Sequence, residues 1–84
     1  MKVLFDEDVW NDYVYWQKTD HAIVQRINVL IKEIQGTPFE GVGKPEALKH
    51  ALSGYWSRRI TDKHRIVYRI KDDCVLIAQL RYHY

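Results

Sequence analysis

The sequence predicts an α+β domain in which an N-terminal helical hairpin packs on one face of an antiparallel sheet. Between residues 9 and 34, apolar residues recur at helical spacing, whereas from residue 48 onward the chain consists of short runs bounded by turn-forming residues. The segment order is therefore one strand, two helices and four strands. This order gives two layers, with both helices on one face of a mainly antiparallel sheet.

Length and composition favour a single folded domain, residues 1–84. The chain is 46% hydrophobic and 29% charged, as globular proteins are, and a chain of this size has room for one core only. Its one cysteine argues against a disulfide framework or a cysteine-based zinc site. No apolar stretch approaches the length of a membrane span, and Asp6, Glu7 and Asp8 interrupt the apolar start, so we expect no signal peptide and a cytoplasmic protein.

The N-terminal half reads as a strand followed by two helices. Lys2 to Phe5 form the strand, and the acidic cluster behind it suits the first turn of a helix that runs to about Lys18. Thr19-Asp20 offers an N-cap for the second helix, which ends at Gly36 before Pro38. The core face of that second helix is predicted from the spacing of its apolar residues: Ile23, Ile27, Leu30, Ile31 and Ile34.

The C-terminal half reads as a loop followed by a sheet. Proline and glycine punctuate a loop from Thr37 to Glu46. The strands that we expect after it are Leu48–Leu52, Tyr55–Thr61, His64–Lys71 and a last one that starts at Cys74 and continues to the end of the sequence.

Strand alternation assigns side chains to the two faces of this sheet. Ile66, Tyr68 and Ile70 are expected to face the helices, as are Leu76, Ala78, Leu80 and Tyr82 of the last strand. The alternating set includes Arg65, Arg81 and His83, which would then lie together on the open face. We therefore predict a cationic surface there, with Arg81 among its RNA-binding residues.

The charge distribution supports a nucleic-acid partner more than the net charge of +2 does. Aromatic residues interleaved with arginines, among them Tyr55, Trp56, Tyr82 and Tyr84, are candidates for stacking on bases. The basic residues gather in the second half: Lys44, Lys49, Arg58, Arg59, Lys63, Arg65, Arg69, Lys71 and Arg81.

Three of these residues suit metal-free cleavage of RNA. The 2'-hydroxyl of RNA is the nucleophile, so the protein needs only a base, a fixed cation and an acid, and the products are a 2',3'-cyclic phosphate and a 5'-hydroxyl. Glu46, Arg65 and His83 are the matching residue types, although Glu46 could equally be a solvated carboxylate and Arg65 a surface ion-pair partner. No metal or cofactor is expected, because Asp62, Asp72 and Asp73 are explained as turn residues and the other histidines, His21, His50 and His64, read as surface residues without metal-ligand spacing.

Four segments spread along the chain carry a family resemblance: Pro38–Lys49, Leu52–Ile60, His64–Tyr68 and Arg81–Tyr84. Together they resemble the YoeB toxins of bacterial toxin–antitoxin modules, in the RelE/ParE superfamily. The resemblance implies a microbial-RNase-like sheet and an endoribonuclease that inhibits translation by cutting mRNA in the ribosomal A site. It also implies a YefM-type antitoxin as partner, and homodimers in the antitoxin complex and on the ribosome.

The same resemblance assigns roles to residues. It implies Glu46 as general base, Arg65 as the arginine that stabilises the transition state, and His83 as general acid. Lys49, Arg59 and Tyr84 match positions that line the RNA site or hold its geometry. Two alternatives stay open: a non-catalytic toxin of the gyrase-inhibitor type, and a module that binds RNA or ribosomes without cutting.

Overall fold

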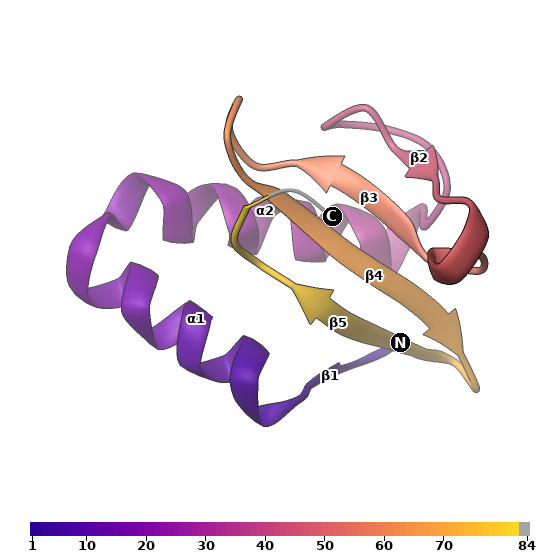
Figure 1. Cartoon of the computed structure of the whole chain (residues 1–84), viewed down its shortest axis with the longest axis horizontal. Helices are drawn as coiled ribbons and strands as arrows, with labels where there is room; N and C mark the ends of the chain where they lie inside the picture. The colour runs from indigo at the N-terminus through magenta and orange to yellow at the C-terminus, as the bar shows by residue number, and fades with distance from the viewer. Residues whose placement is uncertain (83–84) are drawn as a thin grey trace.

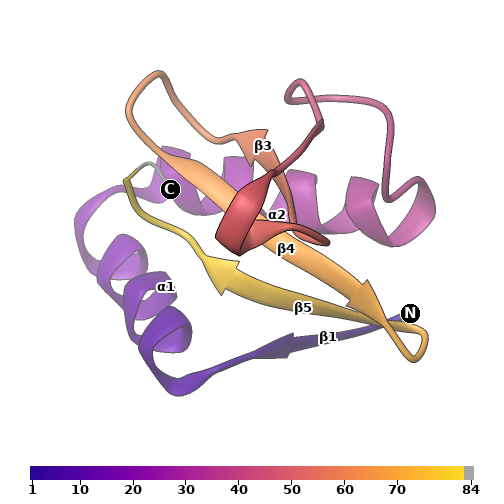
Figure 2. The same cartoon turned by 45° about the vertical axis from the view of Figure 1, so that its right-hand side comes forward.

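The computed structural model describes residues 1–82 of the chain. A five-stranded sheet in the order β1-β5-β4-β3-β2 carries the helices α1 and α2 on one face, and Figures 1 and 2 both show α2 crossing behind β3 and β4. The predicted fold class is confirmed, but the sheet is mixed, because β1 pairs with β5 in parallel. The elements are β1 (Lys2–Phe5), α1 (Glu7–Thr19), α2 (His21–Gly36), β2 (Glu46–Ala47), the 3-10 helix η1 (His50–Leu52), β3 (Trp56–Arg59), β4 (Arg65–Lys71) and β5 (Cys74–Gln79).

Both helices begin at an aspartate. The Asp6 carboxylate accepts the Val9 N–H at 3.0 Å, and Asp20 accepts the N–H groups of Ala22 and Ile23. Each side chain thus satisfies backbone donors that the first helical turn leaves without a partner. The predicted N-cap of the second helix is confirmed, and so is its end at Gly36.

The core lies between the helices and the sheet. Trp16 links α1 to the residue that follows β5, because its indole Nε1–H donates to the Leu80 carbonyl at 3.1 Å. No helix within residues 1–82 is both long and apolar enough to cross a membrane. The buried apolar residues of this core are Val9, Trp16, Ile23, Ile27, Leu30, Ile34, Ile60, Ile66, Tyr68, Val75, Ile77 and Leu80.

The strand predicted at Leu48–Leu52 is wrong. The structure has the short strand Glu46–Ala47 followed by a 3-10 turn over His50–Leu52. The φ angle of His50 is +59°, a left-handed conformation that no continuous strand contains. As a result, Glu46 lies in an edge strand and not in the preceding loop.

The face assignment of the last strand is wrong for residues 75 to 78, and also for Tyr82, which is exposed and does not face the helices. Val75 and Ile77 are buried against the helices, whereas Ala78 is exposed. Tyr68 of β4 pairs with Ile77 while its neighbour Val67 pairs with Gln79, so Ala78 is an extra residue in β5. Such a bulge reverses the alternation, which is why Leu80 faces the core as predicted although Leu76 and Ala78 do not.

A buried arginine holds the loop between α2 and β2 on the sheet. The Arg58 side chain points to the helix side of β3, is fully buried, and donates to the carbonyls of Thr37, Glu40 and Val42. Its Nε also donates to the Tyr68 hydroxyl at 3.2 Å, and that hydroxyl donates to the Pro38 carbonyl at 2.6 Å. Hydrogen bonds from Arg58 and Tyr68 therefore hold four carbonyls of the loop that leads to Glu46.

Tyr68 makes this arrangement sensitive to alkaline pH. Burial raises the pKa of the Tyr68 phenol above its ordinary value of 10.0, against the opposing effect of the Arg58 hydrogen bond and charge. The unfolded chain releases this proton first, so the stabilisation by Tyr68 is complete below about pH 10 and is lost as pH rises through the higher native pKa.

We expect Tyr68→Phe to lower the free energy of unfolding by about 1–3 kcal/mol near neutral pH, because Arg58 and the Pro38 carbonyl each lose a buried partner. The difference from wild type should shrink above about pH 10. Urea unfolding of both proteins near neutral pH and near pH 11 measures it. A difference that stays constant or grows with pH would contradict the assignment.

Candidate active site

Glu46 and Arg65 come together on the face of the sheet opposite the helices. Glu46 lies directly across from Ser57 in the β2–β3 register, and Ser57 lies across from Val67, two residues from Arg65 in β4. The Arg65 Nη1 donates to the Ser57 hydroxyl at 3.2 Å and lies 4.0 Å from the Glu46 Oε2. The Arg65 side chain is 14% exposed and that of Glu46 is 58% exposed. The Arg65 guanidinium is therefore fixed by a hydrogen bond beside the accessible Glu46 carboxylate.

A second arginine adds positive charge at this place. Arg59 is directly opposite Arg65 in the β3–β4 register, on the same face of the sheet. Like charges in this relation disfavour the folded state, and an anionic ligand would relieve the repulsion. The open face therefore carries positive charge at Arg65, as predicted, and at Arg59, which the prediction of this surface did not include.

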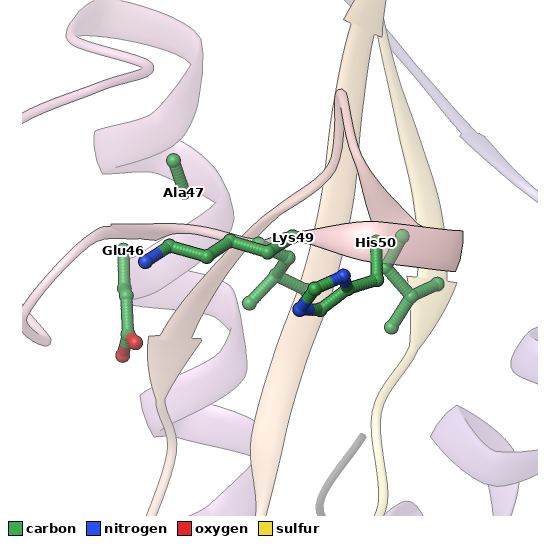
Figure 3. A pocket seen from close by; sticks show the side chains of 6 residues that line it. Glu46, Ala47, Lys49 and His50 are labelled. Atoms are coloured by element: carbon green, nitrogen blue, oxygen red, sulfur yellow. The ribbon is translucent and has the colours of Figure 1, made fainter.

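A shallow pocket continues the site past Glu46. It is formed where β2 enters the 3-10 turn, and Figure 3 shows the Lys49 side chain extending in the direction of Glu46, with the His50 ring on the other side. His50 is exposed, as predicted. The lining residues are Glu46, Ala47, Leu48, Lys49, His50 and Leu52.

His64 is buried, so its prediction as a surface residue is wrong. The residue is 9% exposed, and its imidazole packs edge-on against Trp16, with ring centroids 4.8 Å apart. Its Nδ1 accepts the backbone N–H of Tyr82 at 2.8 Å. The Tyr82 carbonyl in turn accepts the backbone N–H of Arg65 at 3.0 Å and the Gln79 side-chain amide at 3.0 Å.

Arg81 does not lie with Arg65 on the open face, contrary to the prediction. Its guanidinium lies over the Tyr15 ring, 4.0 Å from the centroid, and 3.6 Å from the Asp12 carboxylate, both on α1. The chain has left the strand after Gln79, and the φ angle of Tyr82 is +61°, so strand alternation no longer applies there. Arg81 instead donates to the Tyr82 hydroxyl at 2.9 Å.

His83 and Tyr84, the predicted general acid and a predicted supporting residue, lie outside the described residues. The residue before them is nevertheless fixed to Arg65, because the Arg65 backbone N–H holds the Tyr82 carbonyl. The Arg65 side chain meanwhile reaches toward Glu46. Arg65 thus connects the predicted base to the backbone that leads to the predicted acid.

Two residues of this site were missed in the sequence, Ser57 and His64. Alternation through β3 puts Ser57 on the same face as Arg59, which could have identified it as a partner of Arg65. His64 has the parity of Ile66 and Tyr68, and that parity already indicated the helix side. In both cases the strand period carried a signal that residue type alone did not.

Comparisons with known proteins agree with this architecture. Residues 5–84 match the family model described as YoeB-like toxin of bacterial type II toxin-antitoxin system. The chain is similar to the toxin YoeB of Escherichia coli K12, with 62% identity over 84 residues and the whole of both chains covered. It is also similar to the structure of a YoeB/ParE toxin from Agrobacterium tumefaciens, with a TM-score of 0.97, 48% identity and full coverage of both chains.

Two structures from Staphylococcus aureus show relatives in assemblies. One is a heterotetrameric YoeB–YefM toxin–antitoxin complex, with a TM-score of 0.92 and 44% identity. The other is a YoeB dimer, with a TM-score of 0.93 and 44% identity. In each case the match covers all of this chain and 98% of the other.

Proposed function

Since this chain belongs to the YoeB-like toxin family of bacterial type II toxin–antitoxin systems, we propose that it is an endoribonuclease that cuts messenger RNA in the A site of translating ribosomes. The reaction needs no metal ion, because the nucleophile is the 2'-hydroxyl of the RNA itself. It yields a 2',3'-cyclic phosphate and a 5'-hydroxyl end and inhibits translation.

Glu46, Arg65 and His83 divide the chemistry. The Glu46 carboxylate takes the proton from the 2'-hydroxyl, the Arg65 guanidinium stabilises the charge that develops on the phosphorus-bound oxygens, and His83 protonates the departing 5'-oxygen. Arg59 and Lys49 attract the flanking phosphates, while Arg81 and Tyr84 support the C-terminal segment. These roles require the base and the cation to face one substrate.

One observation supports this proposal most: Arg65 Nη1 lies 4.0 Å from the Glu46 carboxylate and 3.2 Å from the Ser57 hydroxyl. The buried serine and the exposed carboxylate thus both lie near the same guanidinium nitrogen, which the serine hydroxyl holds in place. A phosphodiester bound beside this carboxylate would meet a cation that is already oriented, which is how preorganised electrostatic stabilisation operates.

The partners of the relatives suggest those of this chain. A YefM-type antitoxin would bind the toxin and cover its C-terminal end, and two toxin chains would pair as the Staphylococcus aureus dimer does. Because the substrate is mRNA on the ribosome, the protein would act in the cytoplasm. The open, positively charged face of the sheet is the side that we assign to RNA.

The test is to map RNA ends in a translation reaction. With added protein, new ends should arise within codons of translated messages, with 2',3'-cyclic phosphate and 5'-hydroxyl termini, and only while ribosomes translate. His83→Ala is the inactive control. Arrest of translation without new ends would contradict the nuclease and favour the RNA- or ribosome-binding module. Unaffected translation together with inhibited gyrase would favour the non-catalytic toxin.

A further inference from the structure

We propose that His64 is a positioning residue that fixes the backbone of Tyr82, and with it the start of the segment that carries the catalytic acid. This proposal rests on the function proposed above. His64 is buried and is not one of the three residues to which we assign the chemistry. It affects the reaction only through Tyr82.

Tyr82 is held on both sides of its α-carbon. Its N–H donates to the His64 Nδ1 at 2.8 Å, and its carbonyl accepts from the Arg65 N–H and from the Gln79 amide, each at 3.0 Å. Its φ angle of +61° is uncommon for a residue with a side chain, and such conformations persist only where the surroundings determine them. The His64 and Arg65 contacts are what determine it here.

Contacts other than the one to Tyr82 hold His64 in place. Its backbone N–H donates to the Thr61 hydroxyl at 3.1 Å, and its carbonyl accepts the Ile60 N–H at 2.9 Å. Its ring packs edge-on against Trp16, which binds the Leu80 carbonyl at 3.1 Å. His64 therefore holds the backbone at residue 82 and Trp16 holds it at residue 80, both just before the proposed catalytic histidine.

The hydrogen bond to Tyr82 requires a particular state of His64. An acceptor at Nδ1 needs a lone pair there, so the ring must be neutral with its proton on Nε2. An imidazolium ion or the opposite tautomer would present an N–H to the Tyr82 N–H and break the contact. This chemistry distinguishes an acceptor role from simple packing of an aromatic ring.

Two substitutions distinguish the acceptor role of His64 from the packing of its ring, because each keeps one and removes the other. His64→Phe keeps an aromatic ring against Trp16 and removes the acceptor, whereas His64→Asn loses the ring but keeps an oxygen near the place of Nδ1. Misplacement of a catalytic group by about 1 Å can reduce the rate about 100-fold. We therefore expect His64→Phe to cleave mRNA about 100-fold more slowly than wild type, and His64→Asn to stay within about tenfold.

The test combines cleavage rates in the translation reaction with ¹⁵N NMR of the free proteins. Wild type should show His64 as the neutral tautomer protonated on Nε2. The Tyr82 amide hydrogen should exchange with solvent slowly in wild type and His64→Asn, but rapidly in His64→Phe. Slower cleavage by His64→Asn than by His64→Phe would overturn the proposal, as would equal Tyr82 exchange in all three. A wild-type protein that does not cut RNA would instead overturn the proposed function, and the exchange data would still decide whether His64 holds Tyr82.

Discussion

Arg58→Met should remove a large part of the stability of this protein. The guanidinium is fully buried and serves three loop carbonyls and the Tyr68 hydroxyl. Hydrogen bonds from a charged donor contribute about 1.5–3 kcal/mol each. Methionine no longer has to bury a charge, which costs several kcal/mol in the wild-type protein, and this gain offsets part of the loss. We expect a net loss of about 2–4 kcal/mol in the free energy of unfolding, out of the roughly 4–12 kcal/mol typical of a domain this size.

Urea unfolding of wild type, Arg58→Met and Arg58→Lys measures this effect. Lysine keeps the charge, but a single ammonium group lacks the planar fork that reaches several carbonyls at once, so it should recover little of the loss. A change below about 0.5 kcal/mol in Arg58→Met, the size of an ordinary surface substitution, would contradict the anchoring role.

The same substitution should also disturb the candidate active site. The carbonyls that Arg58 holds belong to Thr37, Glu40 and Val42, in the loop that runs directly into the strand of Glu46. A second contact closes that loop, because the Arg59 N–H donates to the Gly43 carbonyl at 2.7 Å. Arg58→Met should therefore reduce cleavage even at temperatures at which the protein stays folded.

Periodic segments were predictable from the sequence and irregular ones were not. The two helices and the Asp20 cap of the second follow from spacing and from local backbone chemistry, and the structure has them where we expected, whereas Asp6, expected in the first turn of α1, is its N-cap. The bulge at Ala78 and the turn at His50 depend on which residues pair across the sheet, information that no single strand carries. The placement of Arg81 failed for the same reason, since it assumed a straight strand to the end of the chain.

The sequence predicted that Glu46 and Arg65 belong to one candidate site, but it did not predict their supporting residues. Their residue types suit RNA cleavage and the family resemblance implied their roles, and the two side chains do lie side by side. Ser57, which holds Arg65, and His64, which holds Tyr82, are polar residues whose partners lie 8 and 18 residues away in the sequence. Such contacts exist only once the strands have paired, so residue type alone could not reveal them.

Arg65→Gln should reduce mRNA cleavage by about 100- to 1,000-fold, the usual effect of removing one preorganised group that stabilises charge in a transition state. The backbone N–H of residue 65, which holds the Tyr82 carbonyl, is present in every variant at this position. The substitution therefore removes the charge and leaves the anchoring of Tyr82 in place. Single-turnover cleavage of mRNA on programmed ribosomes separates this effect from binding.

Two matched variants decide what Arg65 contributes. Arg65→Lys keeps the charge without the planar donors, so it should recover only part of the rate. Ser57→Ala keeps the arginine but removes the hydroxyl 3.2 Å from its Nη1, and we expect a loss of about tenfold from the poorer orientation. If Arg65→Gln cut within tenfold of wild type, the cation beside Glu46 would be an ion-pair partner and not a catalytic group. If Arg65→Lys cut as fast as wild type, charge alone would suffice and the fixed geometry that Ser57 provides would have no part in the reaction.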